Sequence, residues 1–158
     1  MSRFGRDRRR RPGLTLVDLT ISLFIIAIIA AVGTPRLIDS LDANRTRTAA
    51  RRVAADLEFA RQRAITTSSE QVVRFTTATS SYVLVGMSDP NRPARTYTVT
   101  LPDSPFSCTF TTTGLNSSGE IRFGIHGLPD RAASIIISSG SGQRTVAVEL
   151  STGKVSIL

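Results

Sequence analysis

Five side chains in the second half of the sequence could carry acid–base chemistry, but their surroundings do not support such a role. Asp103 and Asp130 each follow a proline, which is typical of turns. His126 lies in the segment 124–127, which begins and ends with glycine, and has no evident catalytic partner, so we expect an exposed loop histidine. No Gly-x-Ser-x-Gly, His-Glu-x-x-His or glycine-rich phosphate-loop motif is present. We therefore predict that the protein is not an enzyme. The candidates set aside are Asp103, Glu120, Asp130, Glu149 and His126.

Metal and disulfide chemistry is limited by the residue counts. One cysteine and one histidine exclude an internal disulfide and a His/Cys-rich zinc site within one chain. Cys108 has no base close to it in the sequence, and we expect it to be a small buried apolar residue. The absence of Trp and an aromatic content of 6% disfavour a base-stacking platform for single-stranded nucleic acid. We expect no metal and no cofactor.

Most of the net positive charge lies in an N-terminal tail. The 158 residues include 20 Lys and Arg against 12 Asp and Glu, a net charge of +8. Residues 1–11 contain six arginines and one aspartate, which leaves only +3 for the rest of the chain. A strongly basic chain usually indicates nucleic-acid binding. Here the charge instead directly precedes an apolar segment.

This apolar segment, residues 14–33, is long enough to cross a membrane. Twenty helical residues, each rising about 1.5 Å, span the roughly 30 Å hydrocarbon core. The arginines at positions 8–11 would keep the N-terminus in the cytoplasm. A core helix of a soluble protein is disfavoured, because residues 23–33 have no polar face. A secretory signal peptide cut before Thr34 is a further alternative, for which the apolar run is rather long.

Asp18 is the unusual residue of this run. An ionisable group within hydrocarbon costs several kcal/mol unless it is paired or lies near the interface. We therefore expect Asp18 to have a partner or to lie shallow in the membrane, and to be functional.

A second helical segment, residues 34–66, is amphipathic. We expect it to continue the apolar run with a bend at Pro35, because proline removes a backbone hydrogen bond. Arginines fill most of its other positions, and we interpret them as a solvated face with i,i+4 pairs such as Arg52–Asp56 rather than as a nucleic-acid patch. The apolar stripe comprises Leu37, Leu41, Ala49, Val53, Leu57, Ala60 and Ala64.

Beyond residue 66 the composition changes to that of strands and turns. We expect loops at 88–93 and 138–143 and a tight turn at 151–153. The predicted strands are 71–76, 82–87, 96–101, 109–113, 120–123, 134–138, 145–150 and 154–158. The fold class is therefore α+β, with one long helix packed on an antiparallel β-sheet domain. The predicted domains are a leader at 1–13, a helix at 14–66 (membrane-spanning at 14–33) and a β domain at 67–158.

The sequence Gly-Leu-Thr-Leu-Val-Asp at residues 13–18 resembles the class III leader of type IV pilins and type II secretion pseudopilins. The resemblance implies that a prepilin peptidase cuts after Gly13 and methylates the new N-terminus at Leu14. In that family the carboxylate at the fifth mature position neutralises the N-terminal amine within the filament, which assigns an assembly role to Asp18. Pro35 falls where many members have a helix-bending proline. This chain departs from the family in having Leu14 for Phe and Asp18 for Glu.

Later segments extend the resemblance to the minor subunits called GspH and FimT. The similar segments are residues 53–65, Ile-Arg-Phe at 121–123 with Gly127, and residues 144–155. The resemblance implies a minor pseudopilin, associated with the tip of a type II secretion pseudopilus and supporting protein secretion. Its partners would be the prepilin peptidase, other major and minor pseudopilins, the inner membrane and a secreted cargo. Before assembly it would span the bacterial inner membrane once, with a cytoplasmic N-terminus and a periplasmic C-terminal domain.

The alternative is a FimT-like minor pilin that binds DNA during natural transformation. The resemblance would demand a Gly-Arg-x-Arg pattern, and the chain offers only the incomplete Gly-Gln-Arg at 142–144 and Gly-Lys at 153–154. Arg144 and Lys154, with Arg122, would be the DNA-contacting residues. The net charge of +3 beyond residue 11 makes this electrostatic attraction weak. DNA is therefore the less favoured partner.

Overall fold

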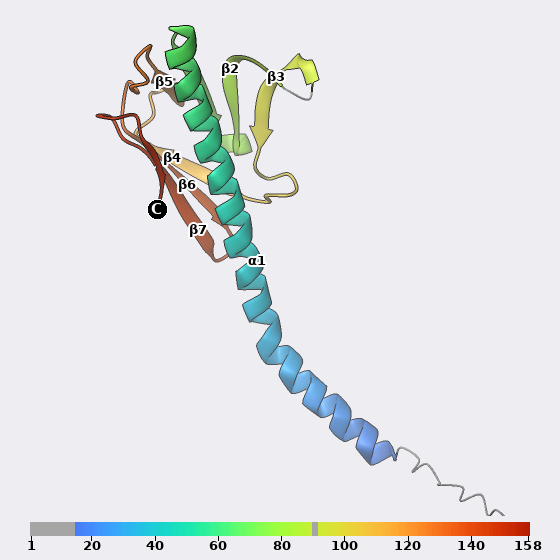
Figure 1. Ribbon diagram of the computed structural model, residues 1–158. Helices are drawn as coiled ribbons and strands as arrows, with labels where there is room; N and C mark the ends of the chain where they lie inside the picture. Colours follow the sequence, from blue (N-terminus) through green and yellow to red (C-terminus); the bar gives the residue numbers. More distant parts are fainter. Residues whose placement is uncertain (1–14, 90–91) are drawn as a thin grey trace, which may run out of the picture. The chain divides into compact units, whose positions relative to one another are not determined.

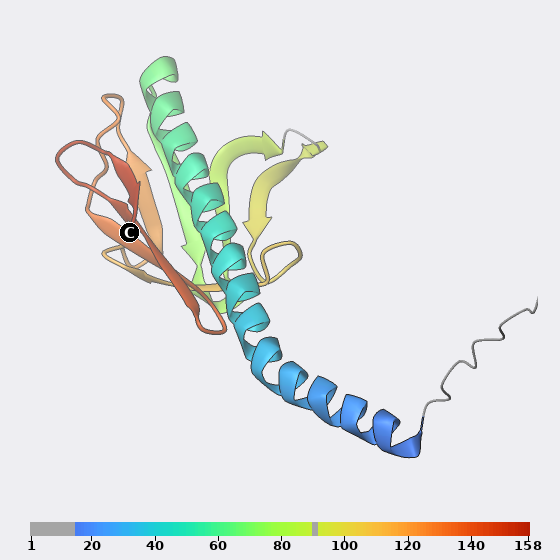
Figure 2. The ribbon, with the colours of Figure 1, turned by 60° about the horizontal axis from the view of Figure 1, so that its bottom comes forward.

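A single helix, α1 (Leu16–Thr67), precedes all the strands in the computed structural model, which describes residues 15–89 and 92–158. The chain divides into two compact units, residues 1–37 and 38–158. In the second unit α1 runs along the β-strands (Figures 1 and 2). The remaining elements are β1 (Gln71–Thr76), the short 3-10 helix η1 (Thr77–Thr79), β2 (Ser81–Asp89), β3 (Arg92–Thr100), β4 (Thr109–Thr113), β5 (Glu120–Phe123), β6 (Ala133–Ser139), β7 (Gly142–Val148) and β8 (Val155–Ile157).

The strands form two antiparallel sheets of four. The first has the order β3-β2-β1-β5 and the second β4-β6-β7-β8. All eight predicted strands are present, and the α+β class with a long N-terminal helix is confirmed. The strands form two sheets where the sequence suggested one, because the chain leaves the first sheet after β3, starts the second with β4 and returns to the first with β5.

Two expected loops are shorter than predicted. The ladder between β2 and β3 extends to the pair Asp89–Arg92, and that between β6 and β7 extends to Ser139–Gly142. Both segments are polar in composition, which favours a loop in a sequence analysis. Polar side chains at the solvated end of a hairpin still allow their backbones to pair, so the strands continue into these segments.

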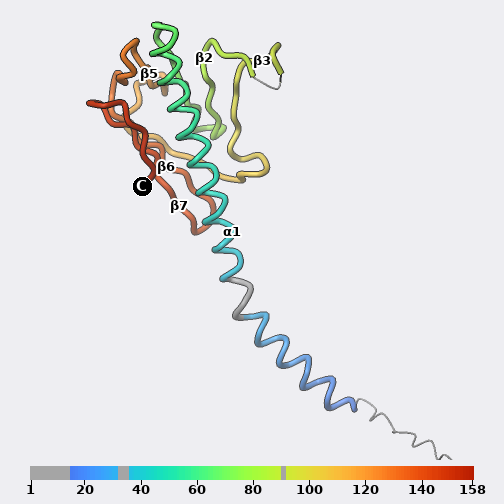
Figure 3. The backbone as a smooth tube through the Cα atoms, in the orientation of Figure 1, coloured from blue at the N-terminus to red at the C-terminus, as the bar shows by residue number. Residues whose placement is uncertain are grey.

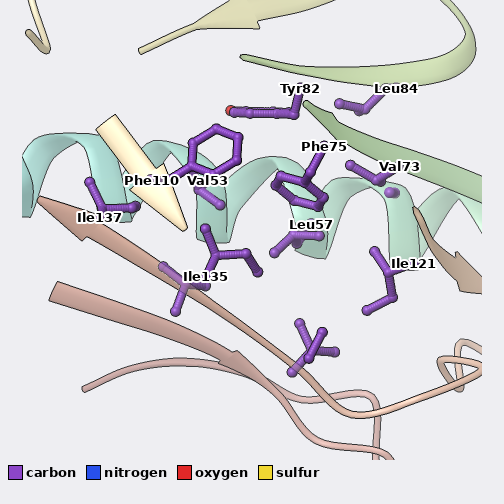
Figure 4. Packing of buried hydrophobic residues seen from close by; sticks show 14 of the residues in the cluster. Val53, Leu57, Val73, Phe75, Tyr82, Leu84, Phe110, Ile121, Ile135 and Ile137 are labelled. Atoms are coloured by element: carbon purple, nitrogen blue, oxygen red, sulfur yellow. The ribbon is translucent and has the colours of Figure 1, made fainter. Parts of the chain in front are cut away.

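The core lies where the alanine-rich stripe of α1 meets the inner faces of the strands. The stripe residues from Ala49 to Ala64 are at most 1% exposed. Figure 4 shows Val53 and Leu57 beside Phe75 of β1, Phe110 of β4 and side chains of β6. The Phe75 and Phe110 rings meet edge to face with 5.7 Å between centroids, which joins the two sheets.

The predicted stripe is wrong at its N-terminal end. Leu37 and Leu41 are 63% and 48% exposed. Burial on α1 begins at Asp42 and Thr46, where the turn between β6 and β7 reaches the helix. Helical periodicity identified the face of the helix but not the point at which the sheets begin to cover it.

Candidate functional site

The N-terminal unit presents an apolar helix surface that the described chain does not cover. Ten large apolar side chains from Leu16 to Ile29 are each 51–78% exposed. Among the described residues, α1 is the one helix long and apolar enough to cross a membrane, and its apolar part is not buried. Exposing one such side chain to water rather than burying it costs about 1.5–3 kcal/mol. The surface therefore requires an external partner, either lipid or other helices.

The first turn of α1 is closed by a reciprocal pair of side chains. Asp18 Oδ2 accepts hydrogen bonds from the Thr15 backbone N–H (3.2 Å) and the Thr15 hydroxyl (2.8 Å). Thr15 Oγ1 accepts the backbone N–H of Asp18 at 3.2 Å. This is a capping box with Asp in place of the usual Glu or Gln, and it satisfies amides that lack helical partners. The carboxylate also lies at the positive end of the helix dipole.

The other hydroxyls at this end bond within the helix. Thr20 donates to the Val17 carbonyl at 2.9 Å, and Ser22 donates to the Asp18 carbonyl at 2.7 Å. Such internal pairing suits a medium without water. The charge of Asp18 differs, because this carboxylate has no ion pair within residues 15–89 and 92–158. A cation from outside the described chain is the partner that its chemistry calls for.

The remaining predicted processing and assembly residues are less fully described. Gly13 and Leu14 lie outside the described residues. At Pro35 the backbone is helical and part of α1, whereas its side chain lies outside the description. Cleavage after Gly13, methylation of Leu14 and the bend at Pro35 stay predictions.

A buried aspartate fastens α1 to the first sheet. Arg52 Nε donates to Asp56 Oδ2 at 3.1 Å, which confirms the predicted i,i+4 pair. The expected solvated setting is wrong, because Asp56 is only 6% exposed. The Tyr82 hydroxyl donates to Asp56 Oδ2 at 2.6 Å and that of Tyr97 to Oδ1 at 3.0 Å. The guanidinium of Arg52 also donates to the Tyr97 hydroxyl.

This cluster is suited to holding structure rather than to catalysis. Burial, followed by the charge of Asp56, raises the pKa of Tyr82, and the same two causes raise the pKa of Tyr97. Both hydroxyls therefore stay protonated and donate to the carboxylate at neutral pH. Both Asp56 oxygens and both tyrosine hydroxyls have hydrogen-bond partners within the cluster, as is usual for buried polar groups in a structural role.

Arg122, one of the three candidate DNA contacts, is engaged by acidic side chains. Its Nη2 lies 3.0 Å from Glu120 Oε2, and its Nη1 lies 3.4 Å from Glu70 Oε1. Glu120 is buried and also pairs with Arg74 at 2.7 Å. Hydrogen bonds from Arg74 and then Arg122 lower the pKa of Glu120. A phosphate would have to displace these carboxylates to bind Arg122.

Gly142 and Gly153, the glycines of the two incomplete Gly-Arg-x-Arg patterns, are both needed for close packing. A Cβ on Gly142 would lie 2.8 Å from the Asp42 carbonyl oxygen. Gly153 has a φ of +68°, and a Cβ there would lie 2.2 Å from the Gly127 carbonyl oxygen. Both positions thus require glycine because of close backbone approach.

The candidate DNA contacts are divided between the two sheets. Arg144 on β7 and Lys154 just before β8 are exposed and belong to the second sheet, whereas Arg122 lies in the first. The structure brings Arg144 instead towards Arg47 and Arg51 of α1, around one hollow. These two arginines were not singled out from the sequence. Their i,i+4 spacing without a nearby acid was the signal that could have identified them.

Four other polar candidates lie outside these clusters. His126 is exposed and Cys108 is 1% exposed, and burial raises the pKa of the Cys108 thiol. The Asp103 carbonyl accepts two backbone N–H groups in a turn, and the Glu149 carboxylate accepts two turn hydroxyls. Within the described part of the chain, no group of His, Cys, Asp and Glu side chains could hold a metal ion.

Comparisons with known proteins agree with this architecture. A family described as "Type II transport protein GspH" matches residues 49–153, about two thirds of the chain. No curated protein sequence matches the chain. The type IV minor pilin FimU of Pseudomonas aeruginosa has a TM-score of 0.53 at 15% identity, covering 73% of this chain and 89% of that one. The minor pseudopilin EpsH of the Vibrio cholerae type 2 secretion system has a TM-score of 0.54 at 13% identity, covering 72% of this chain and 96% of that one. At these identities the likeness establishes the fold.

Proposed function

Because the chain belongs to the GspH family of type II transport proteins, we propose that it is a minor pseudopilin that assembles through α1 into a type II secretion pseudopilus. The observation that carries the proposal is the exposed apolar surface of residues 16–29, on a helix whose later stripe is buried by its own strands. Such a subunit folds with one part of α1 and assembles with the other. This role is structural and needs no catalytic group.

The apolar surface stays covered throughout the proposed cycle. Before assembly, residues 14–33 span the inner membrane, and in the filament they pack against the same segments of neighbouring subunits. The exchange of lipid for helices keeps water away from the ten exposed side chains. A position near the tip and support for a secreted protein cargo complete the proposal.

Asp18 is the proposed pairing group in this assembly. Cleavage after Gly13 by a prepilin peptidase would free the amine of Leu14, and a methylated amine keeps its positive charge. That amine, from a neighbouring subunit, supplies the cation that Asp18 lacks within the described chain. A charge left unpaired in an apolar bundle costs about 3–5 kcal/mol, so the pair would select correctly seated subunits.

The first test is the mature N-terminus of the protein from its own host, by intact mass and peptide mapping. We expect it to begin at N-methylated Leu14. A start at Thr34 would remove the assembling helix and overturn the proposal.

The second test compares variants of Asp18 in the fraction of subunit recovered from sheared filaments. Asp18→Glu should retain incorporation, and Asp18→Asn should reduce it about tenfold or more, because one buried charge loses its partner. Asp103→Asn removes an exposed turn carboxylate and serves as the matched control. Wild-type incorporation of Asp18→Asn would exclude the proposed pair.

A minor pilin of a type IV pilus is the second candidate, favoured by the fold shared with FimU. Deletion of the chain separates the two candidates: loss of cargo secretion supports the pseudopilus, and loss of surface pili with intact secretion supports the pilus. DNA binding belongs to this second candidate. In that case Arg144→Glu with Lys154→Glu should weaken retention of duplex DNA, whereas Arg122 is already occupied by Glu70 and Glu120.

A further inference from the structure

Three arginines converge on one hollow between α1 and β7. Arg47 and Arg51 from the helix and Arg144 from β7 line it, together with Ile157 and Leu158, and its volume is about 420 Å³. All three arginine side chains are exposed. Figure 3 shows α1 and β7 as neighbouring segments although they are far apart in the sequence.

The charges of these arginines are uncompensated within the described residues. Arg47 and Arg51 lie one helical turn apart, and the positions three and four residues from each carry no acid. No ion pair joins either of them or Arg144 to a carboxylate in the part of the chain that is described. By contrast, the adjacent Arg45 and Arg52 pair with Asp42 and Asp56.

Contacts between α1 and the β6–β7 turn keep the three arginines close together. Ser139 Oγ donates to Asp42 Oδ1 at 3.3 Å, and Ser141 Oγ donates to Asp39 Oδ1 at 2.7 Å. Gly142, two residues before Arg144, lies against the Asp42 backbone. These contacts fix β7 beside α1, so the three guanidiniums face one hollow despite their mutual repulsion.

The charge balance of the second unit favours a compact ligand. Residues 38–158 contain 13 basic and 10 acidic residues, a net side-chain charge of only +3, so three arginines around one hollow are a local concentration of positive charge. So small a net charge does not favour a long positive track of the kind that duplex DNA requires.

We propose that this hollow binds an acidic segment of a neighbouring subunit, with a carboxylate between the guanidiniums and an aliphatic neighbour against Ile157 and Leu158. Guanidinium forks bind carboxylates through paired hydrogen bonds. The two apolar side chains, 42% and 73% exposed, supply a complementary surface for the aliphatic part. The choice of a filament subunit as partner rests on the proposed function.

The binding test uses the full chain in non-ionic detergent and a fluorescein-labelled peptide of alternating Glu and Leu. Anisotropy should detect binding, and Arg47→Gln with Arg51→Gln should weaken it about tenfold or more, because two charge-assisted contacts are lost. Arg144→Gln should weaken it as well. The matched control, Arg92→Gln with Arg95→Gln, removes two exposed arginines of β3 and should leave affinity within about twofold.

Three outcomes would overturn the proposal. One is the absence of peptide binding, and another is equal affinity of the double variant and wild type. The third is tighter binding of short duplex DNA at the same residues, which would make the hollow a nucleic-acid site. A peptide with Gln in place of Glu measures how much the negative charge contributes to affinity. The variant Arg47→Lys with Arg51→Lys keeps both positive charges, so binding that it retains would show that substitution at these positions does not itself unfold the protein.

A filament experiment separates this inference from the proposed function. The double variant at Arg47 and Arg51 should keep the mature start at Leu14 but enter sheared filaments less than wild type. If Asp18→Asn blocks incorporation and the arginine variant does not, the hollow has no assembly role and the proposed function stands. If neither variant changes incorporation, both the Asp18 pair and the assembly role of the hollow are excluded, whereas absence of the wild-type chain from sheared filaments would overturn the proposed function itself.

Discussion

From Leu16 to Ile29, α1 exposes ten large apolar side chains, whereas from Ala49 to Ala64 it buries a stripe made mostly of alanine. The more apolar part of the helix is therefore the less buried part. Burial depends on the partner that a surface meets, and the chain supplies strands only to the second part. Alanine suits that contact because a small side chain allows strands to approach the helix closely, whereas large aliphatic side chains suit contact with lipid tails, which are equally apolar.

The same comparison applies to two aspartates of the helix. Asp56 in the second part receives hydrogen bonds from Arg52, Tyr82 and Tyr97. Asp18 in the first part receives only those of the helix start, from Thr15. The fold surrounds the Asp56 carboxylate with three donor side chains, whereas within residues 15–89 and 92–158 it gives the Asp18 carboxylate no ion pair.

The largest expected effect on stability is at Leu57 of α1, and Leu23 of the same helix provides the comparison. Leu57→Ala should lower the free energy of unfolding of the second unit by about 2–5 kcal/mol, because it opens a cavity in the core. Leu23→Ala should change it by less than about 0.5 kcal/mol, since Leu23 is 57% exposed. Urea unfolding in detergent, followed by tyrosine fluorescence, measures this unit, which contains both tyrosines. Similar losses in the two variants would contradict the division of the helix.

Removal of the buried Asp56 carboxylate should have the next largest effect on the free energy of unfolding. Asp56→Asn should destabilise the second unit by about 1–3 kcal/mol, because the buried Tyr82 hydroxyl and Arg52 lose a charged acceptor. Asp103→Asn, at an exposed turn, is the control for the chemical change. An unfolding midpoint equal to that of wild type would indicate that the cluster does not hold the helix to the sheet.

A smaller effect is expected at the turn where burial of α1 begins. Gly140 has a φ of +51°, and a Cβ there would lie 2.0 Å from Asp42 Oδ2. Gly140→Ala should cost about 1–2 kcal/mol through backbone strain and displacement of Asp42. Gly86→Ala has a similar φ of +76° but meets no atom within 4 Å, so it measures strain alone. Equal costs would mean that the contact with Asp42 contributes nothing.

The smallest expected effect is a pH dependence of stability that arises from Tyr82, which binds Asp56 in the second part of the helix. The pKa of Tyr82 is raised in the folded chain, so its hydroxyl stays protonated at a pH where the unfolded chain releases the proton. The contribution of Tyr82 to the free energy of unfolding should therefore be constant below about pH 10 and fall by about 1 kcal/mol per pH unit above it. Tyr82→Phe should flatten this fall when unfolding is measured between about pH 9 and 11. An unchanged slope would assign the dependence to another group.

The features predicted correctly from the sequence depend on local patterns. Hydropathy identified an apolar helix, which the structure has from Leu16 onwards with its apolar side chains exposed, whereas the membrane span at 14–33 stays a prediction. Alternation located the eight strands, although polar hairpin ends concealed two strand extensions. The pair Arg52–Asp56 followed from helical spacing.

Features that depend on distant residues were not predictable in this way. The tyrosines that bind Asp56 lie 26 and 41 residues away in the sequence. Arg144 meets Arg47 and Arg51 only because glycines let the β6–β7 turn approach Asp42. Arg122 matched a basic pattern, but the pattern does not reveal that Glu70 and Glu120 bind it.

The buried thiol of Cys108 makes the protein convenient for spectroscopic distance measurement. It is the single cysteine of the chain, is 1% exposed, and has a raised pKa that keeps it in the unreactive thiol form. Maleimide or nitroxide reagents would therefore modify only cysteines introduced on the surface. Labels at cysteines introduced at Leu23 and Arg95, one in each unit, would report the distance between the two units in detergent, in lipid vesicles and in sheared filaments.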